Sequence, residues 1–92
     1  MSLSTRQKQH TRAELQANLE LSGLSSAELQ QVIGWTLPRL TGALTITGAD
    51  PADVWRLRDV LENAVRDAGR DPVPFSVLTE EVRASASVWF GI

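Results

Sequence analysis

The stretch from Leu24 to Leu44, LSSAELQQVIGWTLPRLTGAL, decides the fold that we expect, because it predicts two short helices joined by a sharp turn. Ser25 and Glu28 have the spacing of a capping box, in which each side chain binds the other residue's free backbone amide at a helix start. Gly34 can adopt the left-handed conformation that closes a helix. The first helix of the pair is therefore expected to begin at this capping box and to end at this glycine.

The second helix of the pair follows directly. Thr36 is a candidate cap for it, and Pro38 is tolerated in its first turn, where the backbone amide has no helical partner. Apolar residues stand where a helix-turn-helix needs them to fill the angle between its helices: Leu29, Ile33, Trp35, Leu40 and Ala43. Gln30 departs from the pattern, because DNA-binding examples usually carry alanine there. Two interpretations remain open: a helix-turn-helix over about 24–44, and a helical corner used only for packing.

A further helix is expected before this stretch. Two capping-box pairs compete as its start, Ser4 with Gln7 and Thr11 with Glu14. Gly23 is placed to end it in the left-handed conformation.

Beyond the corner, the alternating β-branched sequence at 44–48 predicts an extended connection or a short strand. Asp50–Pro51 then supplies a cap and a first-turn proline, so a long amphipathic helix is expected over about 51–68. Its apolar stripe consists of Val54, Leu57, Leu61, Ala64, Val65 and Ala68. Arg58 is expected on the outer side of this helix, paired with Glu62 four residues later.

Pro72 and Pro74 exclude a continuous helix after this point, so residues 70–92 are expected to form an extended segment and a tail. Trp89 and Phe90, near the end of the tail, are too apolar to leave in water without a partner, which makes them candidate interface residues. Two alternatives remain open for them: docking on the chain's own domain and docking on a second subunit.

The composition indicates one soluble domain spanning residues 1–92. Ninety-two residues suffice for a single core, and 42% hydrophobic with 22% charged residues is an ordinary globular balance. The fold class that we expect is mainly α, a small repressor-like bundle of four to five helices with an extended C-terminal segment. The absence of cysteine, of a signal peptide and of a membrane span leads us to expect a cytoplasmic protein.

The charge distribution favours the first half of the chain as the part that approaches a polyanion. The net charge is −2, but it is unevenly distributed. Residues 1–49 contain four cations and three acids, whereas residues 50–92 contain five cations and eight acids. Arg39 is the one cation of the stretch 24–44, and its guanidinium is suited to a guanine edge or a phosphate. The candidate DNA-binding residues are Thr36, Arg39 and Thr41 on the second helix of the corner, with Arg6, Lys8 and Arg12 as flanking backbone contacts.

No arrangement of residues indicates catalysis. His10 is the only histidine and there is no cysteine, so neither a zinc site nor a serine or cysteine nucleophile with its base is expected. Glu80 and Glu81 are adjacent, and adjacent side chains diverge, so they do not form an acid–base pair. We expect no enzyme activity, no metal and no small-molecule cofactor.

A second set of residues, spread over nearly the whole chain, carries a family likeness. They are Met1-Ser2-Leu3, Glu14-Leu15, Asn18, Leu21, Gly23-Leu24-Ser25, Val54-Trp55, Leu57-Arg58, Pro74-Phe75-Ser76-Val77-Leu78 and Trp89-Phe90. In these residues the chain resembles the bacterial family called domain of unknown function 2316. The resemblance implies a small bacterial protein without an established activity, whose middle is similar to the helix-turn-helix of phage repressors. It supplies no catalytic residues.

These observations lead to two function hypotheses. The first is a DNA-binding helix-turn-helix regulator, a homodimer whose partner is double-stranded DNA. The alternative is a protein–protein interaction or dimerisation module that keeps the helix-turn-helix shape without binding DNA.

Overall fold

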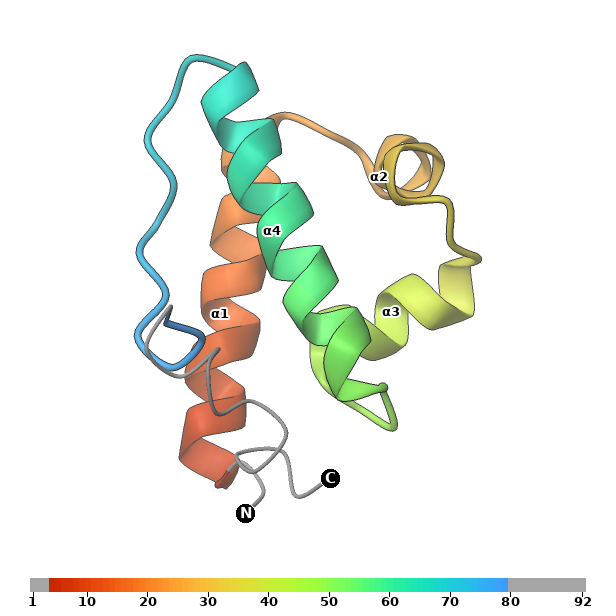
Figure 1. Ribbon diagram of the computed structural model, residues 1–92, viewed down its shortest axis with the longest axis vertical. Coiled ribbons are helices and arrows are strands. Elements are labelled where there is room, and N and C mark those ends of the chain that lie inside the picture. Colours follow the sequence, from red (N-terminus) through yellow and green to blue (C-terminus); the bar gives the residue numbers. More distant parts are fainter. Residues whose placement is uncertain (1–3, 80–92) are drawn as a thin grey trace.

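Two long helices, α1 (Thr5–Ser22) and α4 (Pro51–Asp67), lie side by side and form the centre of the fold (Figure 1). Two short helices, α2 (Ser26–Ile33) and α3 (Leu37–Thr45), lie to one side of them, and a non-helical segment after α4 runs back along α1. The computed structural model describes residues 4–79. These residues form four helices and no strand, which confirms the expected mainly helical fold. None of the four is long and apolar enough to cross a membrane.

Of the two competing capping boxes, the earlier one starts α1. The Ser4 hydroxyl accepts a hydrogen bond from the Gln7 amide at 3.1 Å, and the Gln7 side chain accepts one from the Ser4 amide at 2.9 Å. Thr11 lies inside the helix, where it is buried and its hydroxyl donates to the Gln7 carbonyl at 2.8 Å. Gly23 ends α1 with a φ of 74°, as predicted.

The expected extended connection at 44–48 is wrong, because α3 continues to Thr45. The Ile46 amide donates to the Ala43 carbonyl at 3.3 Å and the Thr47 amide to the Gly42 carbonyl at 3.0 Å, so the last carbonyls of the helix are satisfied by a tight closing turn. Ile46 adopts a φ of 52°, which is unusual for a β-branched residue. These hydrogen bonds and the burial of Ala43 outweigh the weak strand preference of the β-branched residues.

Helix α4 begins as predicted. Asp50 is its N-cap, with a side-chain oxygen 2.9 Å from the Ala52 amide, and Pro51 is its first residue. The predicted stripe supplies four almost fully buried side chains, Val54, Leu57, Leu61 and Val65. Ala68 departs from the prediction, since it is exposed and caps the C-terminal end.

One hydrophobic core joins the four helices to the segment after α4. Its members are Leu15, Leu19, Leu29, Ile33, Trp35, Leu40, Ala43, Val54, Trp55, Leu57, Leu61, Phe75 and Leu78. Phe75 and Leu78 show that the non-helical segment is a structural part of the domain, because both insert into the core that the helices build.

Arg58 does not lie on the outer side of α4, so its predicted position is wrong. Only 6% of the residue is exposed. Its Nε donates to the Leu78 carbonyl at 2.7 Å, its guanidinium lies 4.9 Å from the centre of the Phe75 ring, and its Nη1 lies 3.5 Å from the predicted partner Glu62. A guanidinium can be buried when its donors and charge are matched in this way. Arg58 therefore fastens the segment after α4 to the helix.

Candidate functional site

The corner formed by α2 and α3 is the candidate site. The capping box is present as predicted, with the Glu28 amide 3.1 Å from the Ser25 hydroxyl and the Ser25 amide 3.0 Å from the Glu28 carboxylate. The hydrogen bond that the Glu28 carboxylate accepts from the Ser25 amide lowers the pKa of Glu28, and the Ser25 hydroxyl lowers it further. Gly34 ends α2 with a φ of 79°, and its amide donates to the Gln30 carbonyl at 2.8 Å. Each predicted signal of this first helix is confirmed.

The two helices of the corner run in clearly different directions. Figure 1 shows α2 nearly along its axis, while α3 lies across the view. Three residues, Gly34 to Thr36, join them. The side chains that were expected to fill the angle are all buried: Leu29, Ile33, Trp35, Leu40 and Ala43. The corner is therefore held together by buried side chains, while the outer sides of α2 and α3 are exposed.

The Arg39 side chain extends from the first turn of α3 and contacts two neighbouring side chains. Its Nε and Nη2 each lie 2.8 Å from a carboxylate oxygen of Asp53, which forms a two-pronged ion pair with the first turn of α4. Its guanidinium also stacks 4.5 Å from the centre of the Trp35 ring. Planar pairing and stacking of this kind are what distinguish arginine from lysine. We call Arg39, Asp53 and Trp35 the corner clamp, since they join the turn, α3 and α4.

The corner clamp keeps both of its charged groups ionised. The hydrogen bonds from Arg39 hold the pKa of Asp53 below its usual value of 3.8, and those same hydrogen bonds raise the pKa of Arg39. The nearby charge of Asp50 also raises the pKa of Arg39, by a smaller amount. The positive charge that was expected to face DNA is therefore matched by an acid within the molecule, with a second acid nearby.

Thr36 and Thr41, the other two candidates on α3, are both exposed. Thr36 occupies the N-cap position, as predicted, but its side chain makes no capping hydrogen bond. Arg39 itself keeps 52% of its side chain exposed, so the clamp lies at the surface. The candidate polar groups of α3 are thus all in contact with solvent.

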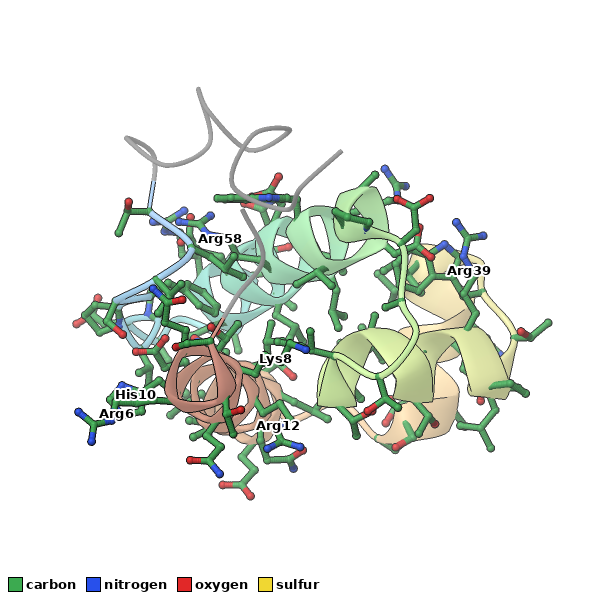
Figure 2. The ribbon with its side chains drawn as sticks, turned by 90° about the horizontal axis from the view of Figure 1, so that it is seen from below. Arg6, Lys8, His10, Arg12, Arg39 and Arg58 are labelled. Carbon is green, nitrogen blue, oxygen red and sulfur yellow. The ribbon has the colours of Figure 1, made fainter. Side chains whose placement is uncertain are left out.

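The flanking cations Arg6, Lys8 and Arg12 are exposed along α1. Figure 2 shows Arg39 at the opposite side of the molecule from Arg6, with Lys8 and Arg12 between them on α1. The structure therefore does not bring the predicted cations together into one patch around the corner. His10 is exposed on α1 as well. Trp89 and Phe90, the candidate interface residues, lie outside the described residues.

Asp53 is the residue of the candidate site that the sequence analysis does not identify. In the sequence it stands out only as an acid in the first turn of the helix that begins at Pro51, where a negative charge complements the helix dipole. The signal was weak, because Arg39 and Asp53 are 14 residues apart and nothing in the sequence says that the starts of α3 and α4 meet. The burial of Arg58 had a clearer signal in the sequence. Arg58 is four residues after Val54 and three before Leu61, so helical spacing places it on the apolar face.

Comparison with known proteins supplies a family and no activity. No curated protein and no solved structure matches the chain. The sequence pattern of one family, described as an uncharacterized protein conserved in bacteria (DUF2316), matches residues 1–91, and the chain therefore belongs to this family.

Proposed function

We propose that this chain is a protein-interaction module that keeps the shape of a helix-turn-helix without depending on DNA. The observation that carries the proposal is the corner clamp. Arg39 is the one cation in α2 and α3, and its charge is paired with Asp53 at 2.8 Å. Affinity for duplex DNA comes mainly from cations that neutralise phosphates, and the outer side of this corner offers no such charge that is free.

The outer side of α3 supports the same proposal. Leu37 is one of two large hydrophobic residues that are exposed among residues 4–79, with 51% of its surface accessible. Pro38 and Thr41 are exposed on the same helix and carry no charge. An uncharged surface with an exposed aliphatic side chain suits a protein partner better than a polyanion.

The partner that we propose for this surface is a second copy of the chain. Substituting Leu37→Glu would place a charge in the interface, whereas Ala13→Glu adds the same charge on an exposed position of α1. Sedimentation equilibrium is expected to give twice the monomer mass for the natural chain and the Ala13 variant. The Leu37 variant is expected to shift toward the monomer. A natural chain that remains monomeric over the whole concentration range would reject self-association.

Trp89 and Phe90 are proposed to contribute to the same pairing. A full-length double variant, Trp89→Ser with Phe90→Ser, tests this in the same sedimentation experiment. For exchange with a second subunit, we expect weaker pairing and an unfolding midpoint that is unchanged when it is measured at a concentration where the chain is monomeric. An unchanged mass together with a lower unfolding midpoint would instead place the tail on its own domain.

Duplex DNA is the second candidate partner, and the exposure of Thr36, Arg39 and Thr41 on α3 favours it. In this alternative Arg39 leaves Asp53 for a base edge or a phosphate. Fluorescence anisotropy with a labelled duplex at increasing salt separates the hypotheses. If the interaction proposal holds, low-salt binding is absent or unchanged in Arg39→Ala. Binding that is strong, suppressed by salt and lost in this variant would favour DNA.

A further inference from the structure

A shallow groove is lined by residues from the C-terminal ends of α1 and α4 and from α2. Figure 1 shows these two helix ends in the upper part of the molecule. The volume of the groove is about 310 Å³, and its lining consists of Ser22, Leu24, Val32, Ala64, Asp67 and Ala68. Such a volume is at the lower end of the range for sites that take small molecules, so it suits one or two side chains of a larger partner.

The groove exists because α2 turns its core face toward α3 and not toward α4. Leu29 and Ile33 are buried in the core, whereas Val32, beside them on α2, is 60% exposed. The apolar residues at the end of α4 that line the groove are Ala64 and the C-cap Ala68, which are one helical turn apart and too small to fill the space. No part of the chain between residues 4 and 79 covers this apolar lining.

The groove also has a defined charge. Asp67 is the one charged residue in its lining, and its carboxylate makes no hydrogen bond or ion pair with residues 4–79. The partial negative charges at the ends of α1 and α4 act in the same direction. The neighbouring cations are engaged: Arg66 pairs with Glu62 at 2.9 Å, and Arg70 donates to the Leu21 carbonyl at 2.8 Å.

We infer that this groove is the docking site for a partner-protein segment that presents an aliphatic or aromatic side chain next to a lysine or arginine. The apolar side chain would lie against Val32, Leu24 and the two alanines, and the cation would face Asp67. The inference rests on the proposed interaction function, but it uses a surface distinct from the outer side of α3.

The test uses two small probes, N-acetyl-Trp-Lys amide and N-acetyl-Trp-Glu amide, titrated into the full-length ¹⁵N-labelled chain and followed by NMR. Saturable shifts are expected at the lining residues, and the lysine probe is expected to bind roughly three- to fivefold more tightly, as a solvent-exposed ion pair allows. Asp67→Asn should make the chain bind the lysine and the glutamate probes with nearly equal affinity. Glu20→Gln, which changes an exposed acid of α1 outside the groove, should leave the preference for the lysine probe unchanged.

Ala68→Leu provides an independent check, since it fills the groove from an exposed position and should weaken both probes by a similar factor. Equal affinity for the two probes, a preference that survives Asp67→Asn, or shifts confined to other surfaces would overturn the inference. Lining shifts caused by protein concentration alone would overturn it as well, because they assign the groove to a second copy. A monomeric chain that still discriminates the probes would refute the proposed self-association and keep the groove.

Discussion

At the scale of single residues, the corner clamp and Arg58 show two different uses of arginine. Arg39 is half exposed, so its ion pair is screened by water and contributes modestly to stability. Arg58 is almost fully buried, and its hydrogen bond to a backbone carbonyl replaces a water contact that folding removes. The first arginine therefore sets the surface charge of the corner, and the second holds the fold together.

Substituting Asp53→Asn should lower the thermal midpoint by a few degrees at neutral pH, because it removes one charge of the clamp. The folded-state pKa of Asp53 is lowered, so its contribution is complete above the unfolded pKa and is lost as pH falls through the lower folded value. The difference between the natural chain and the variant should thus shrink below pH 3.8 and disappear once the pH is below the lowered folded-state pKa of Asp53. A difference that is constant across the acid range in thermal melts would contradict the ion pair.

Substituting Arg58→Met should destabilise the domain by roughly 2–3 kcal/mol, because it removes a charged donor from the buried Leu78 carbonyl. Arg58→Lys is expected to recover only part of the loss, since an ammonium does not reproduce the planar contact with Phe75. Urea titration measures both variants. Arg56→Met, at an exposed position of the same helix, is the matched control and should cost little. Equal effects at positions 56 and 58 would refute the role of Arg58.

At the scale of the elements, the turns rather than the helices determine where the corner forms. Gly23 and Gly34 both have positive φ values, and a Cβ at either position would meet no atom within 4 Å. Their requirement is therefore conformational and not steric. Gly42 differs, because it lies within α3 and has ordinary helical geometry.

The two kinds of glycine predict opposite signs on substitution. Gly34→Ala should cost about 1–2 kcal/mol, because alanine is strained in the left-handed region, and Gly34→Asn should cost less. Gly42→Ala should stabilise by up to about 1 kcal/mol, because alanine has the higher helix propensity. Its Cβ fits, since it would lie 3.4 Å from the Thr47 carbonyl oxygen, at van der Waals distance. Chemical denaturation measures the free energy of unfolding of the three variants. A change of the same sign for alanine at both glycines would contradict this account.

At the scale of the whole molecule, Asn18 ties the beginning of the chain to its later part. It is fully buried, and its side chain binds the Val73 amide at 2.9 Å and the Val73 carbonyl at 3.1 Å. Glu14, one turn earlier, accepts hydrogen bonds from the Ser76 amide and hydroxyl. The segment after α4 therefore follows α1 through polar contacts that span more than 50 residues, 55 in the case of Asn18 and Val73.

Substituting Asn18→Asp tests this tie without changing the size of the side chain. The new carboxylate would face the Glu14 and Val73 carbonyls, so we expect a loss of roughly 2–4 kcal/mol at neutral pH. Burial raises the pKa of such a group, so the penalty should shrink as pH falls and the carboxylate becomes protonated. Urea titrations at pH 7 and pH 5 measure it. A penalty that grows in acid would show that the buried carboxylate is not charged.

The sequence by itself determined most of the local signals of this protein: the capping box at Ser25, the closing glycines, the start of α4 at Asp50 and most of its apolar stripe. Each depends on residues within a few positions of one another, so their spacing alone predicts them. The sequence offered Ser4 as one of two possible starts of α1, and the structure decided between them. Only the tertiary structure decided that Arg39 is paired with Asp53 and that α1's cations lie away from it. These relations join separate elements, and their geometry follows from how the helices pack. The same packing buries Arg58 and extends α3 to Thr45, because contacts with the rest of the molecule outweigh local preference.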